Sequence, residues 1–273
     1  MASVTYDFTG STIAITGAAR GLGAHMAREF ARAGADLALC DLEKTPAGLD
    51  YDTSTPGELA AIEEEVRELG AQTVSMAVDV RDEGQIQEFF AAAASKLGDL
   101  DVFVNNAGVF VGNMPVTETS EEQWDLAIDV NLKGPFLCTK HAVQSMVDGG
   151  RVIIIGSTSS LIGIPYQVPY QASKHGVIGA VRTLALELAP RGITVNALCP
   201  TVAHTPMLEY LAREEASYYL DEVARLAGAF TIFPGVEAIE PEDVSGATMW
   251  LASPAARYVT GAAFALDAGY TIK

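Results

Sequence analysis

The sequence predicts an α/β fold: a single doubly wound domain whose central parallel sheet of about seven strands carries helices on both faces. Three observations support this prediction. Short, almost continuously apolar runs alternate with longer segments of helical periodicity along the 273 residues. Strands that are apolar throughout are typical of parallel sheets covered on both faces. Right-handed crossovers then distribute the connecting helices over the two sides of the sheet.

One helical pattern lies between each pair of consecutive apolar runs, which indicates repeated strand–helix–strand units. The expected strands are Thr12–Thr16, Asp36–Cys40, Thr73–Val78, Val102–Val104, Arg151–Ile155, Thr194–Leu198 and Ala263–Leu266. The expected helices are Leu22–Ala33, Gly57–Leu69, Asp82–Leu97, Glu121–Val147, Gln171–Leu188 and Pro241–Ala252.

Two stretches do not follow the alternation. Residues 43–56 contain two prolines, a glycine and few apolar side chains, which predicts a surface insertion on the cofactor side. Residues 205–240 are mixed, with a helix expected from Met207 to about Ala227, and are expected to form a lid over the substrate. No polar linker divides the chain, so residues 1–273 are expected to form one domain.

The overall composition excludes several classes of protein. The 17 basic and 35 acidic residues give a formal net charge of −18, which disfavours nucleic-acid binding. Cys40, Cys138 and Cys199 form no CxxC pair and have no nearby histidine, so we expect buried free thiols, with no metal site and no disulfide framework. The chain shows no secretory signal and no apolar stretch near the roughly 20 residues of a membrane span, so a soluble cytoplasmic protein is expected.

A glycine-rich turn follows the first strand. Gly17 and Gly21 lie between that strand and the next helix, and Gly23 lies in the first turn of that helix. Glycine suits this position because the turn is tight and the backbone must come close to a pyrophosphate at the helix N-terminus. The pattern favours a Rossmann-type dinucleotide site over a plain tight turn.

The second strand ends at an acidic residue, Asp41. A carboxylate there can accept hydrogen bonds from the ribose hydroxyls of NAD, and it repels the additional phosphate of NADP. Arg20 is the opposing observation, because it can bind a phosphate or neutralise Asp41. Because Arg20 can act in either way whereas Asp41 opposes the additional phosphate, the sequence predicts that the cofactor is NAD rather than NADP.

Three residues with complementary chemistry follow in the second half of the chain. Tyr170 and Lys174 are four residues apart at the start of a helical pattern, so they share one helix face. A neighbouring ammonium group lowers the pKa of a phenol and makes it a usable base. Ser157, 13 residues before Tyr170, ends a central strand, where open α/β sheets bind their ligands.

Together these motifs resemble the short-chain dehydrogenase/reductase family over essentially the whole chain. The matching residues are TGAARGLG at 16–23, Asp79-Val80, NNAG at 105–108, Asn131, Ser157, YQASK at 170–174, and Pro200 followed by Thr205.

The resemblance implies a hydride transfer that interconverts a secondary alcohol and its ketone. It assigns proton transfer to Tyr170, orientation of the substrate oxygen to Ser157, ribose binding and tuning of the phenol to Lys174, and a helix kink with a relay water to Asn131. The implied cofactor contacts are Gly17, Arg20, Gly21, Leu22, Gly23, Asp41, Leu42, Asp79, Val80, Asn106, Ala107, Gly108, Lys174, Pro200, Ala203 and Thr205.

The chain departs from the family pattern in three places. Thr201 stands where the family usually has glycine, and three further hydroxyl residues follow Ser157. The 43–56 insertion resembles a narrower branch that includes carveol-dehydrogenase-like and mycofactocin-associated enzymes, in which this loop is thought to cover the adenosine end and hold NAD tightly. A tolerated surface loop is the alternative interpretation.

The expected substrate contacts are Ser157, Tyr170, His204 and Met207. Apolar residues in the expected lid favour a cyclic or terpenoid alcohol. A sugar dehydrogenase or epimerase and a catalytically silent NAD-binding protein are the alternative functions. By resemblance the chain is expected to form a homotetramer, with a dimer as the alternative.

Overall fold

In the computed structural model, which describes residues 4–49, 51–211, 223 and 229–272, seven parallel strands form one sheet in the order β3-β2-β1-β4-β5-β6-β7. The strands are β1 (Thr12–Thr16), β2 (Asp36–Asp41), β3 (Thr73–Ala77), β4 (Leu100–Asn105), β5 (Met146–Ile155), β6 (Thr194–Pro200) and β7 (Ala263–Leu266). The doubly wound α/β fold predicted from the sequence is confirmed.

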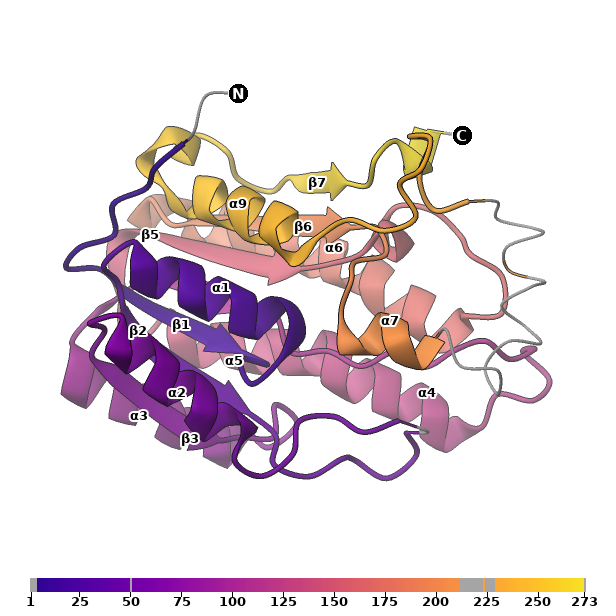
Figure 1. The fold of residues 1–273 in the computed structure, drawn as a ribbon, viewed down its shortest axis with the longest axis horizontal. Helices are drawn as coiled ribbons and strands as arrows, with labels where there is room; N and C mark the ends of the chain where they lie inside the picture. Colours follow the sequence, from indigo (N-terminus) through magenta and orange to yellow (C-terminus); the bar gives the residue numbers. More distant parts are fainter. Residues whose placement is uncertain (1–3, 50, 212–222, 224–228, 273) are drawn as a thin grey trace.

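Helices cover both faces of the sheet (Figure 1). The first face packs against α1 (Gly21–Arg32), α2 (Glu58–Glu68) and α9 (Pro241–Ala252). The second face packs against α3 (Glu83–Leu97), α4 (Glu121–Ile128), α5 (Gly134–Ala142) and α6 (Val168–Leu188). A short helix, α7 (Pro206–Leu211), lies beyond the ends of the central strands.

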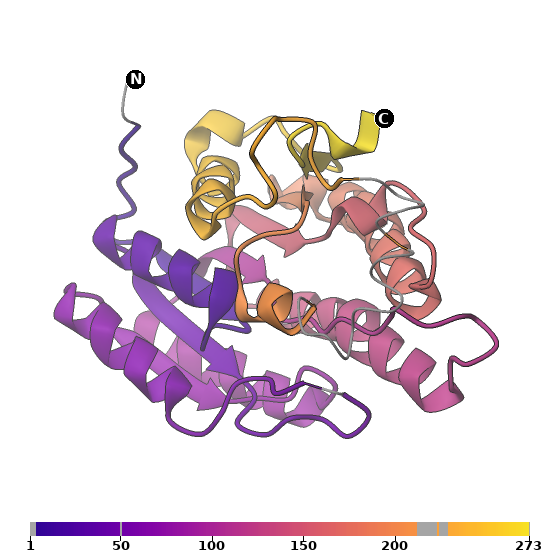
Figure 2. The same ribbon diagram turned by 45° about the vertical axis from the view of Figure 1, so that its right-hand side comes forward.

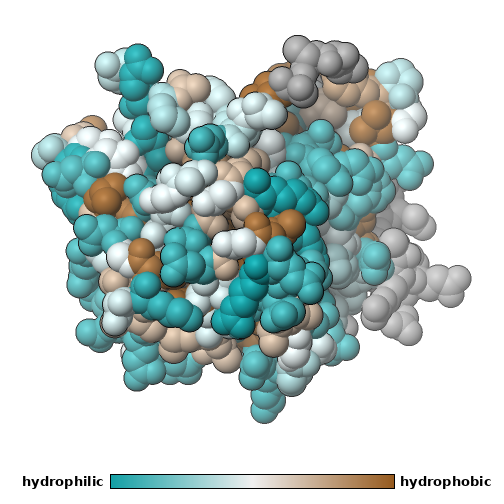
Figure 3. All heavy atoms as spheres, turned by 60° about the vertical axis from the view of Figure 1, so that its left-hand side comes forward, coloured by the Kyte–Doolittle hydropathy of each residue, from teal (hydrophilic) through white to brown (hydrophobic). Residues whose placement is uncertain are grey.

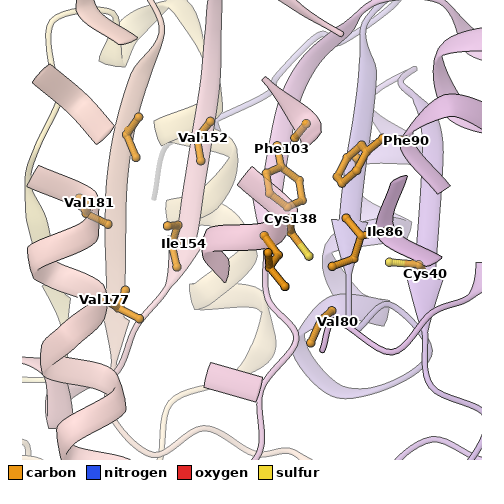
Figure 4. Close-up of a cluster of buried hydrophobic side chains, with 14 of the residues drawn as sticks. Cys40, Val80, Ile86, Phe90, Phe103, Cys138, Val152, Ile154, Val177 and Val181 are labelled. Atoms are coloured by element: carbon orange, nitrogen blue, oxygen red, sulfur yellow. The ribbon is translucent and has the colours of Figure 1, made fainter. Parts of the chain in front are cut away.

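Each central strand contributes apolar side chains to two cores, because successive residues point to opposite faces. In β1, Ala14 lies in the core on the α5 and α6 side, whereas Ile13 and Ile15 lie in the core on the α1 and α9 side. Figure 4 shows the first of these cores, where Val177 and Val181 of α6 face the sheet. This two-sided burial explains why the strands read as continuous apolar runs.

The order of the strands reverses at β1, which pairs with β2 on one side and with β4 on the other. The connections after β1 and β4 therefore leave in opposite directions, and a crevice opens at the carboxyl ends of these strands. Thr16 bridges the strand ends, since its hydroxyl oxygen accepts hydrogen bonds from the backbone N–H groups of Asn106 at 3.1 Å and Ala107 at 3.0 Å.

The single helix expected over Glu121–Val147 is wrong. The segment is divided into α4, a π-helical turn η1 (Asp129–Lys133) and α5, and β5 begins at Met146 rather than at Arg151. Apolar periodicity does not distinguish an α-helix from one that contains a π turn, nor a helix end from the start of a buried strand. The helix expected from Met207 begins at Pro206, and its continuation lies outside the described residues.

Figure 3 shows the molecule turned toward the side on which the strands begin. Hydrophilic residues predominate on that face and hydrophobic ones are scattered, as expected for a chain of net charge −18. Among the described residues, no helix combines the length and apolar character needed to cross a membrane.

Candidate active site

A cavity of about 570 Å³ occupies the crevice at the carboxyl ends of the strands. Nearly all the site residues expected from the sequence line it, and only Gly23 and Asn131 lie outside its wall. Those that line it are Gly17, Arg20, Gly21, Leu22, Asp41, Leu42, Asp79, Val80, Asn106, Ala107, Gly108, Ser157, Tyr170, Lys174, Pro200, Ala203, His204, Thr205 and Met207.

The glycines of the β1–α1 turn are required by close packing. Gly17 has φ +66°, and a Cβ atom there would lie 2.9 Å from the Cα of Ala107 in the loop after β4. A Cβ atom on Gly23 would overlap the carbonyl oxygen of Gly17. Side chains at these positions would push apart the turn, the start of α1 and the loop after β4, so the turn forms a cradle of bare backbone.

Asp41 lies at the carboxyl end of β2 and is bound by three donors. Its Oδ2 accepts the backbone N–H of Ala19 at 2.8 Å, and its Oδ1 accepts the N–H of Leu42 and the hydroxyl of Ser54, both at 2.7 Å. Burial raises the pKa of this carboxyl, against the opposing effect of these donors and the charge of Arg20. A carboxylate has about four acceptor positions, so roughly one remains on Oδ2.

The 43–56 insertion is attached to this end of the cleft. The guanidinium of Arg20 donates to the carbonyl oxygens of Asp52 at 2.6 Å and Thr53 at 3.0 Å, and Ser54 binds Asp41 as described above. From the sequence, Arg20 was expected either to bind a phosphate or to neutralise Asp41, and its contact with the insertion was not foreseen. Its charge does act on Asp41, but its hydrogen bonds hold the loop over the glycine turn.

Asp79, which follows β3, is paired with Arg81. The Arg81 Nε atom lies 2.9 Å from Oδ1 and 3.0 Å from Oδ2 of the Asp79 carboxylate. Burial tends to raise the pKa of Asp79, but the bonds from Arg81 outweigh it and the pKa is lowered. Asp79 is therefore held as an anion at the wall of the cleft.

Tyr170, Lys174 and Ser157 converge at the carboxyl end of β5. Lys174 donates from Nζ to the carbonyl oxygen of Ile155 at 2.9 Å, and this Nζ lies 5.7 Å from the centre of the Tyr170 ring. Ser157 follows β5 directly, and its hydroxyl is a hydrogen-bond partner of the Tyr170 phenol. The three residues come from the end of a strand and the first two turns of α6.

Burial is the main cause of the shifted pKa values of Tyr170 and Lys174. It raises the pKa of Tyr170 to about 12, a shift that the Ser157 hydrogen bond partly offsets. It lowers the pKa of Lys174 to about 8. At neutral pH the phenol therefore carries its proton, and most of the lysine is charged.

The neighbouring serines do not share this position. The Ser157 hydroxyl oxygen accepts the backbone N–H of Ser159 at 3.1 Å, which fixes the Ser157 side chain at the start of a short 3₁₀ turn, η2 (Thr158–Ser160). Ser159 also lines the cleft, but only Ser157 acts on the pKa of Tyr170. The assignment of the catalytic role to Ser157 rather than Ser159 stays a prediction.

Asn131 lies inside the π turn η1 and contacts α6. Its amide oxygen accepts the backbone N–H of Val109, and its amide nitrogen donates to the carbonyl oxygen of Val109, both at 2.8 Å. The amide nitrogen also donates to the Ser173 hydroxyl at 3.3 Å. The extra residue of a π turn displaces the backbone locally, and such turns are frequent at functional sites. Asn131 thus joins the loop after β4 to α6.

Comparison with known proteins agrees with this geometry. The family model described as enoyl-(acyl carrier protein) reductase matches residues 17–271. The chain belongs to the short-chain dehydrogenase/reductase family. A short-chain type dehydrogenase/reductase of Mycolicibacterium smegmatis is 36% identical, over 97% of this chain and 98% of the relative.

Two carveol dehydrogenases are similar to this short-chain dehydrogenase/reductase. The (−)-trans-carveol dehydrogenase of Rhodococcus erythropolis is 35% identical, over 97% of this chain and 98% of the relative. The crystal structure of a carveol dehydrogenase from Mycobacterium avium in complex with NAD superposes with a TM-score of 0.90 at 32% identity, and the match covers 98% of this chain and 100% of that one.

The segment after β6 explains one departure of this short-chain dehydrogenase/reductase from its family. Thr201 is buried, and its hydroxyl donates to the carbonyl oxygen of Phe230 at 2.8 Å. A glycine there would leave that carbonyl without this partner. Thr201 therefore ties the end of β6 to the segment that begins at residue 229.

His204, Thr205 and Met207, which follow β6, are partly exposed. Thr205 donates from its hydroxyl to the carbonyl oxygen of Ala203 at 3.3 Å. The imidazole of His204 lies 3.7 Å from the Glu240 carboxylate and is about half exposed. Met207 lies on α7 and lines the cleft.

Several lining residues were missed from the sequence. Tyr51 of the insertion, Phe110 and Asn113 of the loop after β4, and Gln167 before α6 all contribute to the wall. The oxygen of the Asn113 amide is buried, with no hydrogen-bond partner among the described residues. Phe110 and Asn113 follow the NNAG motif closely, and that proximity was the available signal. Among the described residues, no cluster of side chains suits a metal ion.

Proposed function

We propose that this chain is an NAD(H)-dependent oxidoreductase that interconverts a secondary alcohol and its ketone. The convergence of Tyr170, Ser157 and Lys174 carries this proposal, because it places a proton donor and acceptor, a polarising hydroxyl and a cation in one cleft. The opposite end of the same cleft holds Asp41 and the glycine turn.

The residues present fit a nicotinamide dinucleotide. The turn at Gly17 and Gly23 is a backbone cradle that side chains would fill, which suits a pyrophosphate at the start of α1. The remaining acceptor position of Asp41 suits a ribose hydroxyl and opposes a phosphate on that ribose. The NAD complex of the Mycobacterium avium relative supports the same choice.

Bound NAD supplies the atom that accepts or gives the hydride. The chain's own residues handle the proton and the orientation. Tyr170 gives its phenolic proton to the substrate oxygen during ketone reduction and takes it back during alcohol oxidation. Ser157 holds that oxygen by a hydrogen bond, and the Lys174 ammonium group favours the phenolate.

The substrate end of the cleft favours an apolar alcohol. Ile164, Met207, Leu208 and Phe230 line the cleft together with Phe110. Burial of apolar surface against these side chains stabilises a cyclic or terpenoid body far better than a sugar. The similarity to a carveol dehydrogenase agrees with this substrate class.

The insertion is proposed to hold the adenosine end of NAD. Its bonds to Arg20 and Asp41 fix the loop at the wall where the ribose would lie. Because the loop is anchored at two points, release of the nucleotide requires that these contacts open. Denaturing the freshly purified protein and identifying the released nucleotide tests this, and loss of all NAD on dialysis would contradict it.

A homotetramer is proposed from the apolar residues left on the second helix layer. Phe136 of α5 is 53% exposed, and Val168 and Leu186 of α6 are 44% and 80% exposed. Exposed apolar side chains on two adjacent helices are typical of an interface. Light scattering with size-exclusion chromatography measures the assembly directly.

The activity is tested by following NADH formation with a panel of cyclic secondary alcohols. Tyr170→Phe should bind NADH as the original chain does and lose most of its turnover, because the proton acceptor is removed while the ring stays. Full turnover in that variant would refute the assigned chemistry.

A further inference from the structure

Tyr51 belongs to the insertion on the cofactor side, yet it is packed against elements of the substrate side. Its side chain is 7% exposed, and its ring stacks on Tyr210 of α7 with centres 4.6 Å apart and planes at 29°. In Figures 1 and 2 the loop after β2 passes below α7. The insertion therefore reaches from the end of β2 to the expected substrate lid.

The hydroxyl of Tyr51 makes a second contact on the substrate side. It accepts the backbone N–H of Phe110 at 2.8 Å, and the Phe110 ring packs against the catalytic Tyr170 with centres 5.1 Å apart. The burial of Tyr51 raises its pKa, so the hydroxyl stays protonated at neutral pH. A single intervening residue thus separates Tyr51 from the catalytic phenol.

The residues that follow Tyr51 contact the other half of the cleft. The carbonyl oxygens of Asp52 and Thr53 accept the guanidinium of Arg20, and Ser54 donates to Asp41. Four consecutive residues, Tyr51 to Ser54, therefore contact the glycine turn, the Asp41 carboxylate, the loop after β4 and α7. Only two residues separate Tyr51 from Ser54, and the backbone carbonyls of both are bound by Arg20.

We propose that Tyr51 is a positioning residue of the substrate compartment and that it makes binding of the dinucleotide and of the alcohol cooperative. The inference rests on the proposed function, which assigns the two halves of the cleft. A dinucleotide that orders Asp52–Ser54 also fixes the position of Tyr51. Tyr51 in turn fixes the positions of Phe110 and α7, which surround the alcohol. Coupling of this kind is reciprocal, so the alcohol must also strengthen binding of the dinucleotide. Because differences in affinity at one site are expressed mostly in the dissociation rate, we expect the alcohol to slow release of the dinucleotide.

The decisive experiment compares Tyr51→Ala, Tyr51→Phe, Tyr210→Ala and the double alanine variant with the original chain. The first measurement is the rate at which NADH leaves the protein, followed by fluorescence with and without the alcohol that performs best in the panel. NADH and an alcohol do not react, so the measurement reports binding alone. The matched control is Lys44→Gln, an exposed residue of the same insertion.

We expect the alcohol to slow NADH release by about fivefold or more in the original chain and in Lys44→Gln. The effect should nearly vanish in Tyr51→Ala and in Tyr210→Ala, and the double variant should show no further loss, because both residues act through one contact. The KM for the alcohol should rise about tenfold in Tyr51→Ala, with kcat within about threefold. An unchanged effect of the alcohol in Tyr51→Ala would overturn the proposal.

A second measurement needs neither a substrate nor the alanine variants. Hydrogen exchange at the Phe110 amide reports the bond to Tyr51, and Tyr51→Phe keeps the ring while removing the acceptor. Added NAD should slow this exchange in the original chain and leave it unchanged in Tyr51→Phe. Equal slowing in both chains would overturn the proposal, whereas a chain that binds no NADH at all would instead refute the proposed function.

Discussion

Replacing Asp41 by asparagine tests the choice between NAD and NADP. A phosphate charge about 4 Å from the carboxylate is opposed by about 4 kcal/mol at an effective dielectric constant near 20. Asp41 is partly open to solvent, which weakens that repulsion. We therefore expect Asp41→Asn to strengthen NADP binding by about tenfold to a hundredfold, since 1.4 kcal/mol corresponds to tenfold.

The same substitution should lower stability, because the amide nitrogen cannot accept a hydrogen bond. The new amide can be placed in two orientations. The better one keeps an oxygen at the Oδ1 position, which has two donors, and puts the nitrogen at the Oδ2 position, so the backbone N–H of Ala19 loses its acceptor. An unpaired buried donor costs about 1 to 3 kcal/mol. For a chain of this size, we expect the midpoint of thermal unfolding to fall by about 2 to 4 °C for each kcal/mol lost.

Binding of both nucleotides by titration calorimetry, together with thermal unfolding, gives the comparison. Asp36→Asn is the matched control, because it removes the same charge from the opposite end of the same strand. The control should leave the preference between the two nucleotides unchanged. A preference for NAD that is fully retained in Asp41→Asn would refute the electrostatic argument.

Three further predictions concern the catalytic group and its support. Ser157→Ala should lower kcat by about a hundredfold or more while Ser159→Ala stays within a few-fold, and the reverse order in steady-state assays would show that the wrong serine was assigned. Because burial raises the pKa of Tyr170 to about 12, the phenolate fraction grows with pH throughout the range below that value. Alcohol oxidation, which needs the phenolate, should therefore rise with pH, whereas ketone reduction, which needs the phenol, should stay nearly constant until the pH approaches that pKa. Lys174→Met should move the rise in oxidation to higher pH, and identical pH profiles would contradict this role. Thr201→Val should cost about 1 kcal/mol, measured by denaturant unfolding, because a buried carbonyl loses its donor; no loss of stability would show that the bond contributes nothing.

Local patterns were sufficient to predict the α/β fold, the glycine turn, the acidic end of β2 and the Tyr170–Lys174 pair, whereas most other candidate site residues came from the resemblance to the family. Each buried strand is an apolar run because both of its faces are covered, and each such run is visible without knowledge of its neighbours. The glycine turn and the Tyr170–Lys174 pair were also visible, because their geometry is set within one turn or one helix face. The prediction failed at η1, where a π turn leaves no signature in the apolar period.

Only the tertiary structure decided which distant residues share a wall of the cleft. No local pattern relates Tyr51 to Phe110 or to Tyr210, since their contacts depend on where the insertion, the loop after β4 and α7 meet in space. The partners of Arg20 and the hydroxyl bond of Thr201 are decided in the same way. Periodicity and turn chemistry act over a few residues, whereas these contacts form only once the order of the strands has brought separate loops to one edge of the sheet.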